Sequence, residues 1–218
     1  ELKQADVKLQ GWAVEARIYA EDPLRNFLPS VGRLVRYQPP AEGAGVRVDA
    51  GVYEGGEVSM YYDPMIAKLI GYGDTRDEAI TRLSEALDRY VIRGPAHNIA
   101  FLSALVAHPR FVRGDMTTAF IEEEYPDGFG PAYVNHPEPR RLIALAAVLE
   151  FKANPSSFDA DGSAVAVQMG DDERTRFDVH VVRHDGADVV IVDGNTFEVA
   201  LEWHAGAELV SCFIDSEA

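Results

Sequence analysis

Arg17 is the residue whose type and setting best suit chemistry. It lies between Glu15 and Tyr19 on the polar face of a strand predicted over residues 11–19, where apolar and polar side chains alternate. A guanidinium is a planar fork of donors that can hold an anion or stabilise negative charge that develops in a reaction. The alternative is a surface arginine that is solvated or paired with Glu15, the commoner situation for an arginine on a strand.

Other residues of chemical interest favour structural roles. Lys68 lies in an apolar stretch, where it either extends to solvent from the edge of the core or contributes to a site. His180 and His184 fall on one strand face, but no further ligand lies at metal-binding spacing, so we predict no metal site. The glycine clusters match neither a dinucleotide fingerprint nor a phosphate-binding loop, and we expect no nucleotide site in this chain.

The composition is that of a globular protein with an acidic surface. The 218 residues carry a formal net charge of −16, and 47% of them are hydrophobic. Such a charge repels nucleic acid phosphates and anionic membranes, so we expect neither as a partner. It serves solubility or, alternatively, recognition of a basic partner subunit. The single cysteine, Cys212, excludes an internal disulfide and fits a reducing compartment.

The first 130 residues have the pattern of short strands followed by helices. A largely apolar strand is predicted over residues 65–72, and its composition suggests a central place in the sheet. Thr75 and Glu78 form a capping box that opens a helix, and Gly94-Pro95 ends it. The other predicted elements are strands over 11–19, 32–38 and 46–50 and helices over 98–107 and 117–124.

A second region follows a stretch rich in proline and turn formers over residues 127–139, where we place a domain boundary. An apolar helix is predicted over 139–152, and a helix so apolar needs cover on most sides. Five strands with hairpin signals at Asp185-Gly186 and Asp193-Gly194 complete the chain. The predicted class is α+β, with an antiparallel sheet and helices over 1–130, then a helix and an antiparallel meander or partial barrel over 131–218.

Two long segments carry a family resemblance. Glu-Ala-Arg-Ile-Tyr-Ala-Glu-Asp-Pro at 15–23 and Tyr-Tyr-Asp-Pro-Met-Ile-Ala-Lys-Leu at 61–69 resemble the C-terminal part of the biotin carboxylase domain in biotin-dependent acyl-CoA carboxylases. Further blocks in the same order, including Tyr90-Val-Ile-Arg-Gly94 with His97-Asn98, extend the resemblance to Asp115. Matches that are long and ordered are more specific than one short motif.

The resemblance implies an ATP-dependent ligase and a role for each candidate residue. Arg17 is implied to contact bicarbonate and the biotin ureido group and to stabilise the biotin enolate. Asp63 is implied either to orient Arg17 or simply to cap the turn before Pro64, and Arg47 either lies at an interface or is solvated. The ligands of ATP and magnesium, the other cofactors besides biotin, are expected before residue 1, so the isolated chain is expected to be inactive.

The second region resembles the linking domain of the alpha subunits in this family. The pattern is most similar to the propionyl-CoA carboxylases, and the 3-methylcrotonyl-CoA carboxylases share the layout. The implied partners are a carboxyltransferase beta subunit and the biotin carrier domain of the same parent chain, in a hetero-oligomer. The implied location is the bacterial cytoplasm or, in a eukaryote, the mitochondrial matrix. The alternative is an assembly or binding module that takes no part in catalysis.

Overall fold

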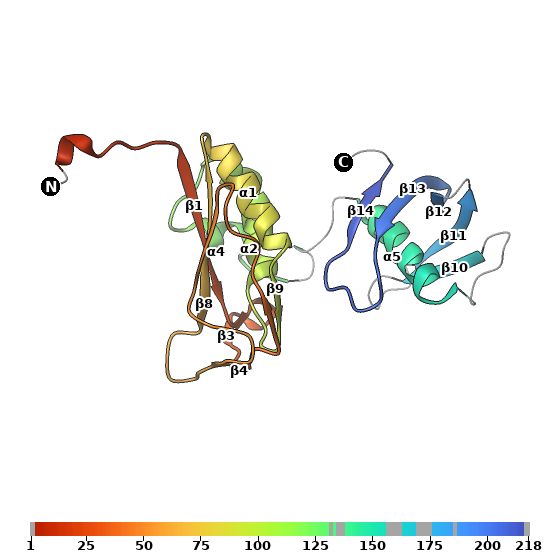
Figure 1. Ribbon diagram of the computed structural model, residues 1–218, viewed down its shortest axis with the longest axis horizontal. Helices are drawn as coiled ribbons and strands as arrows, with labels where there is room; N and C mark the ends of the chain where they lie inside the picture. Colours follow the sequence, from red (N-terminus) through yellow and green to blue (C-terminus); the bar gives the residue numbers. More distant parts are fainter. Residues whose placement is uncertain are drawn as a thin grey trace. The chain divides into compact units, whose positions relative to one another are not determined.

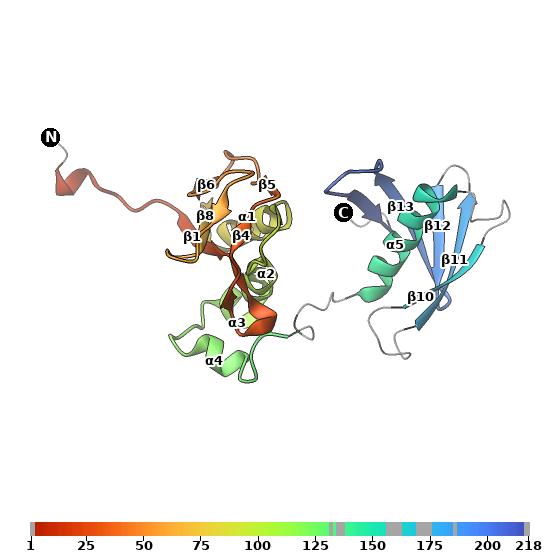
Figure 2. The same cartoon turned by 90° about the horizontal axis from the view of Figure 1, so that it is seen from below.

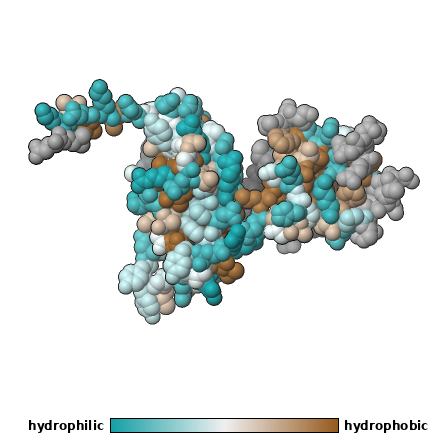
Figure 3. All heavy atoms as spheres, viewed as in Figure 1, coloured by the Kyte–Doolittle hydropathy of each residue, from teal (hydrophilic) through white to brown (hydrophobic). Residues whose placement is uncertain are grey.

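The computed structural model describes residues 3–130, 133, 138–155, 163–168, 176–184 and 187–215. The chain divides into two compact units, Glu1–Val134 and Asn135–Ala218. Both combine helices with antiparallel strands, which confirms the predicted α+β class (Figure 1). The face of the first unit seen in Figure 3 is largely hydrophilic, as the net charge of −16 leads one to expect.

The first unit is built on a small antiparallel sheet with the strand order β1-β8-β6. The unit also contains three two-stranded pairs, β2-β3, β4-β7 and β5-β9. The strands are β1 (Trp12–Tyr19), β2 (Glu21–Asp22), β3 (Leu28–Pro29), β4 (Gly32–Arg33), β5 (Arg36–Gln38), β6 (Val46–Ala50), β7 (Glu57–Val58), β8 (Met65–Gly73) and β9 (Val91–Arg93). The α-helices are α1 (Arg76–Asp88), α2 (Ile99–Ala107), α3 (Pro109–Arg113) and α4 (Phe120–Glu124), with 3-10 turns η1 (Gln4–Asp6) and η2 (Pro23–Arg25).

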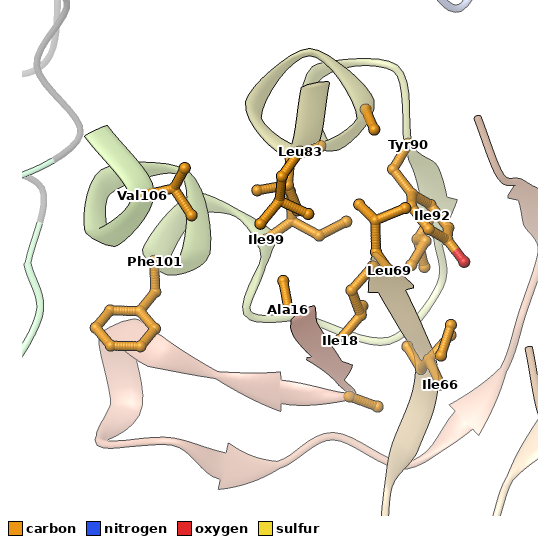
Figure 4. Close-up of a cluster of buried hydrophobic side chains, with 14 of the residues drawn as sticks. Ala16, Ile18, Ile66, Leu69, Leu83, Tyr90, Ile92, Ile99, Phe101 and Val106 are labelled. Atoms are coloured by element: carbon orange, nitrogen blue, oxygen red, sulfur yellow. The ribbon is translucent and has the colours of Figure 1, made fainter. Parts of the chain in front are cut away.

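The sheet has one buried face and one polar face. Ala16 and Ile18 of β1 are buried, whereas Glu15 and Arg17 are exposed, so the predicted alternation is confirmed in the second half of the strand. Trp12, which was expected on the apolar face, is 55% exposed. The strand predicted to be central, β8, does lie between β1 and β6 and is mostly buried. Figure 4 shows side chains of β1, β8, α1 and α2 pointing into one core, among them Ile18, Leu69, Leu83 and Ile99.

Helix α1 packs on the buried face of the sheet because β8 contributes glycines at the crossing. A Cβ atom on Gly71 would lie 2.4 Å from the Ala79 carbonyl oxygen and 2.8 Å from the Leu83 amide nitrogen. Gly73 is equally close to the first turns of the helix, where an added Cβ would lie 2.5 Å from that of Glu78. The helix therefore approaches the backbone of β8 more closely than any larger residue allows.

The start of α1 realises the capping box only in part. The Thr75 hydroxyl accepts a hydrogen bond from the Glu78 amide at 3.2 Å, as predicted. The Glu78 carboxylate, however, accepts from the amide of Asp74 at 3.0 Å and not from that of Thr75. Both bonds still satisfy backbone donors at the helix start, so the signal located the helix correctly.

Several predicted boundaries in the first unit were wrong. The single strand expected over 32–38 is two strands, because the chain changes partner: Leu34 donates to the Gly56 carbonyl and Val35 to that of Arg93, both at 2.8 Å. The helix expected to run to Gly94 ends at Asp88, and β9 follows it, paired with β5. The helix expected over 117–124 covers only Phe120–Glu124. The helix expected over 98–107 is confirmed as α2, which ends at Ala107, but the short helix α3 that follows it was not predicted.

A half-buried phenol, Tyr37, and a buried one, Tyr90, join β5 to the segment before β9. The hydroxyl groups of Tyr37 and Tyr90 lie 2.5 Å apart, and Tyr90 is only 6% exposed. Burial raises the pKa of both phenols above the ordinary tyrosine value. Once the pH passes the unfolded pKa of about 10, the unfolded chain therefore binds fewer protons than the folded one.

The free energy of unfolding should accordingly fall as the pH rises above about 10. Below that pH the stability that the two phenols contribute is fully present. In Tyr90→Phe this fall should be shallower, because, of this pair, the half-buried phenol of Tyr37 alone then remains. Urea denaturation between pH 7 and 11.5, followed by circular dichroism, measures the slope. Tyr53→Phe is the control, since Tyr53 is 74% exposed. Equal alkaline slopes for Tyr90→Phe and the unmodified chain would contradict the assignment.

The second unit packs one helix on an open five-stranded antiparallel sheet (Figure 2). Its strands pair in the order of the sequence, so the predicted meander is confirmed, and over the described residues the sheet is not closed into a barrel. The elements are α5 (Pro139–Ala153), β10 (Ser163–Gln168), β11 (Arg176–His184), β12 (Ala187–Val192), β13 (Asn195–Glu202) and β14 (Ser211–Ile214). Asp193 and Gly194 form the predicted two-residue hairpin with positive φ at both positions, whereas Asp185-Gly186 lies outside the described residues.

The core of this unit lies between one face of α5 and the middle strands. The buried helix residues are Ile143, Ala144, Ala147 and Val148, and they pack against valines of β11 and β12. Leu142 is 39% exposed, so among the described residues the helix is covered on one face and not on most sides as we expected. The Lys152 ammonium lies 3.1 Å from the nearly buried carboxylate of Asp188 and fastens the helix to β12.

Candidate active site

The polar face of the β1-β8-β6 sheet brings together charged residues from three strands. Its two cross-strand rows are Arg17–Lys68–Asp49 and Glu15–Ile70–Arg47. Residues paired across strands stand close together on one face, so the register alone places basic and acidic groups side by side. Arg17 and Arg47 thus share a face, on the two outer strands, with β8 between them.

The Arg17 guanidinium is exposed, and among the residues that the structure describes it is held from its own strand alone. Its Nε donates to the Glu15 carboxylate at 3.0 Å, and the side chain remains 57% exposed. The hydrogen bond to Glu15, and then the Tyr19 side chain, raise the pKa of Arg17, so the group stays cationic. Within the described part of the chain no other element covers the fork, which therefore faces outward from the sheet.

The backbone of Arg17 is held much more firmly than its side chain. The Asn98 side-chain amide donates to the Arg17 carbonyl oxygen at 3.1 Å and accepts from the Tyr19 amide at 2.9 Å. The Asn98 backbone amide also donates to the Tyr19 carbonyl at 3.2 Å. The sequence pattern indicates a helix start at residue 98 but no further role, because these contacts join residues about eighty positions apart.

Asp63 lies in the turn that precedes β8. Its carboxylate accepts a hydrogen bond from the Met65 amide at 3.1 Å, the contact of a turn-capping aspartate. The turn is fastened to the end of β1 because the Ala20 amide donates to the Pro64 carbonyl at 2.8 Å. Partial burial, and then the charge of Asp63, raise the pKa of Glu21. Among the described residues Arg17 and Asp63 form no ion pair, so these contacts favour the turn-capping alternative.

Arg47 and Lys68 complete the polar face. Arg47 binds Asp49 through two parallel hydrogen bonds of 2.9 and 2.7 Å and is 70% exposed. These hydrogen bonds lower the pKa of Asp49. Lys68 is half-buried and lines an open depression of about 520 Å³ between β6 and the start of β8. Arg17 of β1 is the cross-strand partner of Lys68 of β8, but it does not line this depression.

The described residues offer little beyond this face for other chemistry. They contain no group of three histidine, cysteine or acidic side chains placed to hold a metal ion. His180 is exposed on β11, and the side chain of His184 lies outside the described residues. In the part of the chain that the structure covers, no helix has the length and apolar character needed to cross a membrane.

Comparison with known proteins agrees with this fold. Residues 15–123 match the biotin carboxylase C-terminal domain family, and the chain belongs to this family. A biotin carboxylase domain of the 2-oxoglutarate carboxylase of Hydrogenobacter thermophilus, solved with MgADP and bicarbonate, superposes with a TM-score of 0.56 at 35% identity. That match covers 63% of this chain and 29% of the solved one. The resemblance found in the sequence is thereby confirmed.

The curated relatives extend the similarity into the second unit. The propionyl-CoA carboxylase alpha chain of Ruegeria pomeroyi is 43% identical over 98% of this chain and 35% of its own length. The human mitochondrial propionyl-CoA carboxylase alpha chain is 41% identical over 96% of this chain and 30% of its own length. The chain therefore spans about a third of the length of these relatives.

Proposed function

We propose that this chain forms the C-terminal part of the biotin carboxylase domain, with the following linking region, in an alpha subunit of the propionyl-CoA carboxylase type. The complete subunit would use ATP and bicarbonate to carboxylate biotin. The similarity of nearly the whole chain to propionyl-CoA carboxylase alpha chains supports the choice among acyl-CoA carboxylases. Alpha subunits specific for 3-methylcrotonyl-CoA or another acyl-CoA are the alternative of the same class.

The observation that carries the proposal is the open guanidinium fork of Arg17. It lies on the exposed face of a sheet inside the matched family region, and its own strand alone engages it among the described residues. A planar donor pair that faces outward fits a ureido oxygen or the oxygens of bicarbonate. The residues present therefore fit biotin and bicarbonate at this face, and the pairing with Glu15 leaves the charge in place.

Carboxylation of biotin would require this part of the chain to stabilise negative charge. When the ureido nitrogen of bound biotin becomes nucleophilic, negative charge builds on the ureido oxygen. A guanidinium fixed beside that oxygen stabilises the charge where it develops, without reorganising at the moment of reaction. We assign this task to Arg17. The groups that bind ATP and its metal would be supplied by parts of the subunit other than these residues.

The second unit would serve docking and not catalysis. It lies beyond the matched family region, which ends at residue 123, yet the similarity to propionyl-CoA carboxylase alpha chains continues across it. We assign to it contact with the carboxyltransferase beta subunit in a hetero-oligomer. The biotin carrier domain of the parent chain would bring biotin to the first unit. In a bacterium the assembly would be cytoplasmic, and in a eukaryote it would lie in the mitochondrial matrix.

The test uses the complete natural polypeptide that contains this sequence. We expect a denatured intact mass well above 24.0 kDa, with a biotin adduct, and ATP-dependent fixation of labelled bicarbonate onto free biotin. With the beta subunit added, propionyl-CoA should be carboxylated faster than 3-methylcrotonyl-CoA or acetyl-CoA. A polypeptide of 24.0 kDa without biotin would favour the binding-module alternative. Preference for another acyl-CoA would overturn only the substrate assignment.

A further inference from the structure

We propose that Asn98 is the positioning residue for Arg17, fixing the strand from which the guanidinium projects. The inference rests on the role proposed for Arg17 and adds a residue to that site. Asn98 itself is 5% exposed, lies at the start of α2, and would act only through the backbone of β1.

The side chain of Asn98 does not cap its own helix. It occupies the N-cap position of α2, where an asparagine oxygen commonly accepts a hydrogen bond from the second or third helical amide. Here the side chain makes no such bond. Its oxygen and nitrogen instead bind the Tyr19 amide and the Arg17 carbonyl, so the amide serves β1 and not its own helix.

β1 needs the hydrogen bonds from Asn98 at its outer edge. It is an outer strand, so the backbone groups that point away from β8 lack a neighbouring strand at that edge. The pairing with β8 is also irregular there, with a register shift between Ile18 and Tyr19. The side chain and backbone amide of Asn98 replace the missing strand along Arg17–Tyr19, just where the ladder is least regular.

Asn98 is itself held in place by hydrogen bonds. Its carbonyl accepts the first bond of α2 from the Leu102 amide at 3.0 Å. Two residues earlier, the Ala96 amide donates to the Ser30 hydroxyl at 2.9 Å. Since the described contacts of the Arg17 guanidinium all come from within β1, its location depends on the course of this strand. A displacement of about 1 Å at a catalytic group can lower a rate by about a hundredfold.

The test is a pair of Asn98 variants in the complete subunit. Asn98→Ala removes both side-chain bonds to β1 and should lower kcat for free biotin about 10- to 100-fold, with KM for ATP unchanged. Asn98→Asp keeps the shape and the acceptor for Tyr19 but loses the donor to Arg17, and it should also lower kcat. It serves as the working variant where Asn98→Ala does not fold.

A matched control separates positioning from loss of stability. Val106→Ala truncates another buried residue of α2, 2% exposed, that makes no hydrogen bond to β1. It should lower the melting temperature and leave kcat unchanged at temperatures well below unfolding. If the Asn98 variants change only the melting temperature, as Val106→Ala does, the positioning role is overturned.

A double-mutant cycle with Arg17→Ala completes the experiment. If Asn98 acts through Arg17, its replacement should lower kcat in the unmodified subunit but have little further effect in the Arg17→Ala background. Equal effects in both backgrounds would overturn the inference and leave the role of Arg17 intact. An Arg17→Ala variant with full activity would overturn the proposed function itself, so the two failures are distinguishable.

Discussion

Arg17→Ala in the complete subunit is expected to lower kcat for carboxylation of free biotin about 100- to 1,000-fold. This is the usual loss when one preorganised donor is removed from a site of developing negative charge. The free energy of unfolding should change by less than about 1 kcal/mol, since the side chain is 57% exposed and its described ion pair is with Glu15 of the same strand. Steady-state assays with labelled bicarbonate and thermal unfolding of the same preparation measure both quantities.

Two further variants make the Arg17 experiment specific. Arg17→Lys keeps the charge but loses the planar fork, so it should recover only part of the lost rate. Arg89→Ala removes an exposed arginine of the first unit that lies 3.4 Å from Glu85, and it should leave kcat unchanged. Equal losses in Arg17→Ala and Arg89→Ala would mean that net charge, and not the position of the guanidinium, determines the rate.

Gly71→Ala is expected to destabilise the first unit by about 3 kcal/mol. The added methyl group would lie 2.4 Å from the Ala79 carbonyl oxygen and 2.8 Å from the Leu83 amide nitrogen, which are backbone atoms of α1. Neither can rotate aside, so the helix must move off the sheet and open the core that Leu83 fills. Overpacking of this kind typically costs about 1–3 kcal/mol, and backbone contacts place this one at the upper end. Urea denaturation of the chain measures the loss.

Gly51→Ala is the matched control for Gly71→Ala. Its Cβ would approach only the Ile66 carbonyl oxygen, at an ordinary 3.9 Å, and its φ does not require glycine. We expect a change within about 0.5 kcal/mol. A Gly71→Ala variant as stable as Gly51→Ala would show that α1 can withdraw from β8 without loss, and the close packing described for this sheet would be wrong.

The strands nearest the candidate site could be predicted because their side chains alternate. Arg17 was placed on the polar face of β1 from its neighbours, and the structure exposes it there. The apolar run over 65–72 correctly indicated a central strand, which has β1 at one edge and β6 at the other. In both segments the signal is local, since it lies in the composition and alternation of consecutive residues.

Features set by distant partners could not be predicted. Leu34 and Val35 look like the middle of one strand, but Leu34 donates to Gly56 and Val35 to Arg93, and this change of partner divides the strand. Val91 continues a helical spacing, yet pairing with Gln38 makes it part of a strand. Asn98 is the clearest example. An asparagine before an apolar helix indicates an N-cap, and nothing local shows that its amide binds residues 17 and 19.

The strand pairing of the first unit affects the order in which the two units fold. β1 is completed by β8 and by Asn98, which binds Arg17 across 81 positions of the sequence. In the second unit each described strand pairs with its neighbour in sequence. Contacts between distant residues slow folding because a long loop must close first. During synthesis the strand of Arg17 must therefore wait until residue 98 has left the ribosome, and after dilution from denaturant the second unit should acquire its structure before the first.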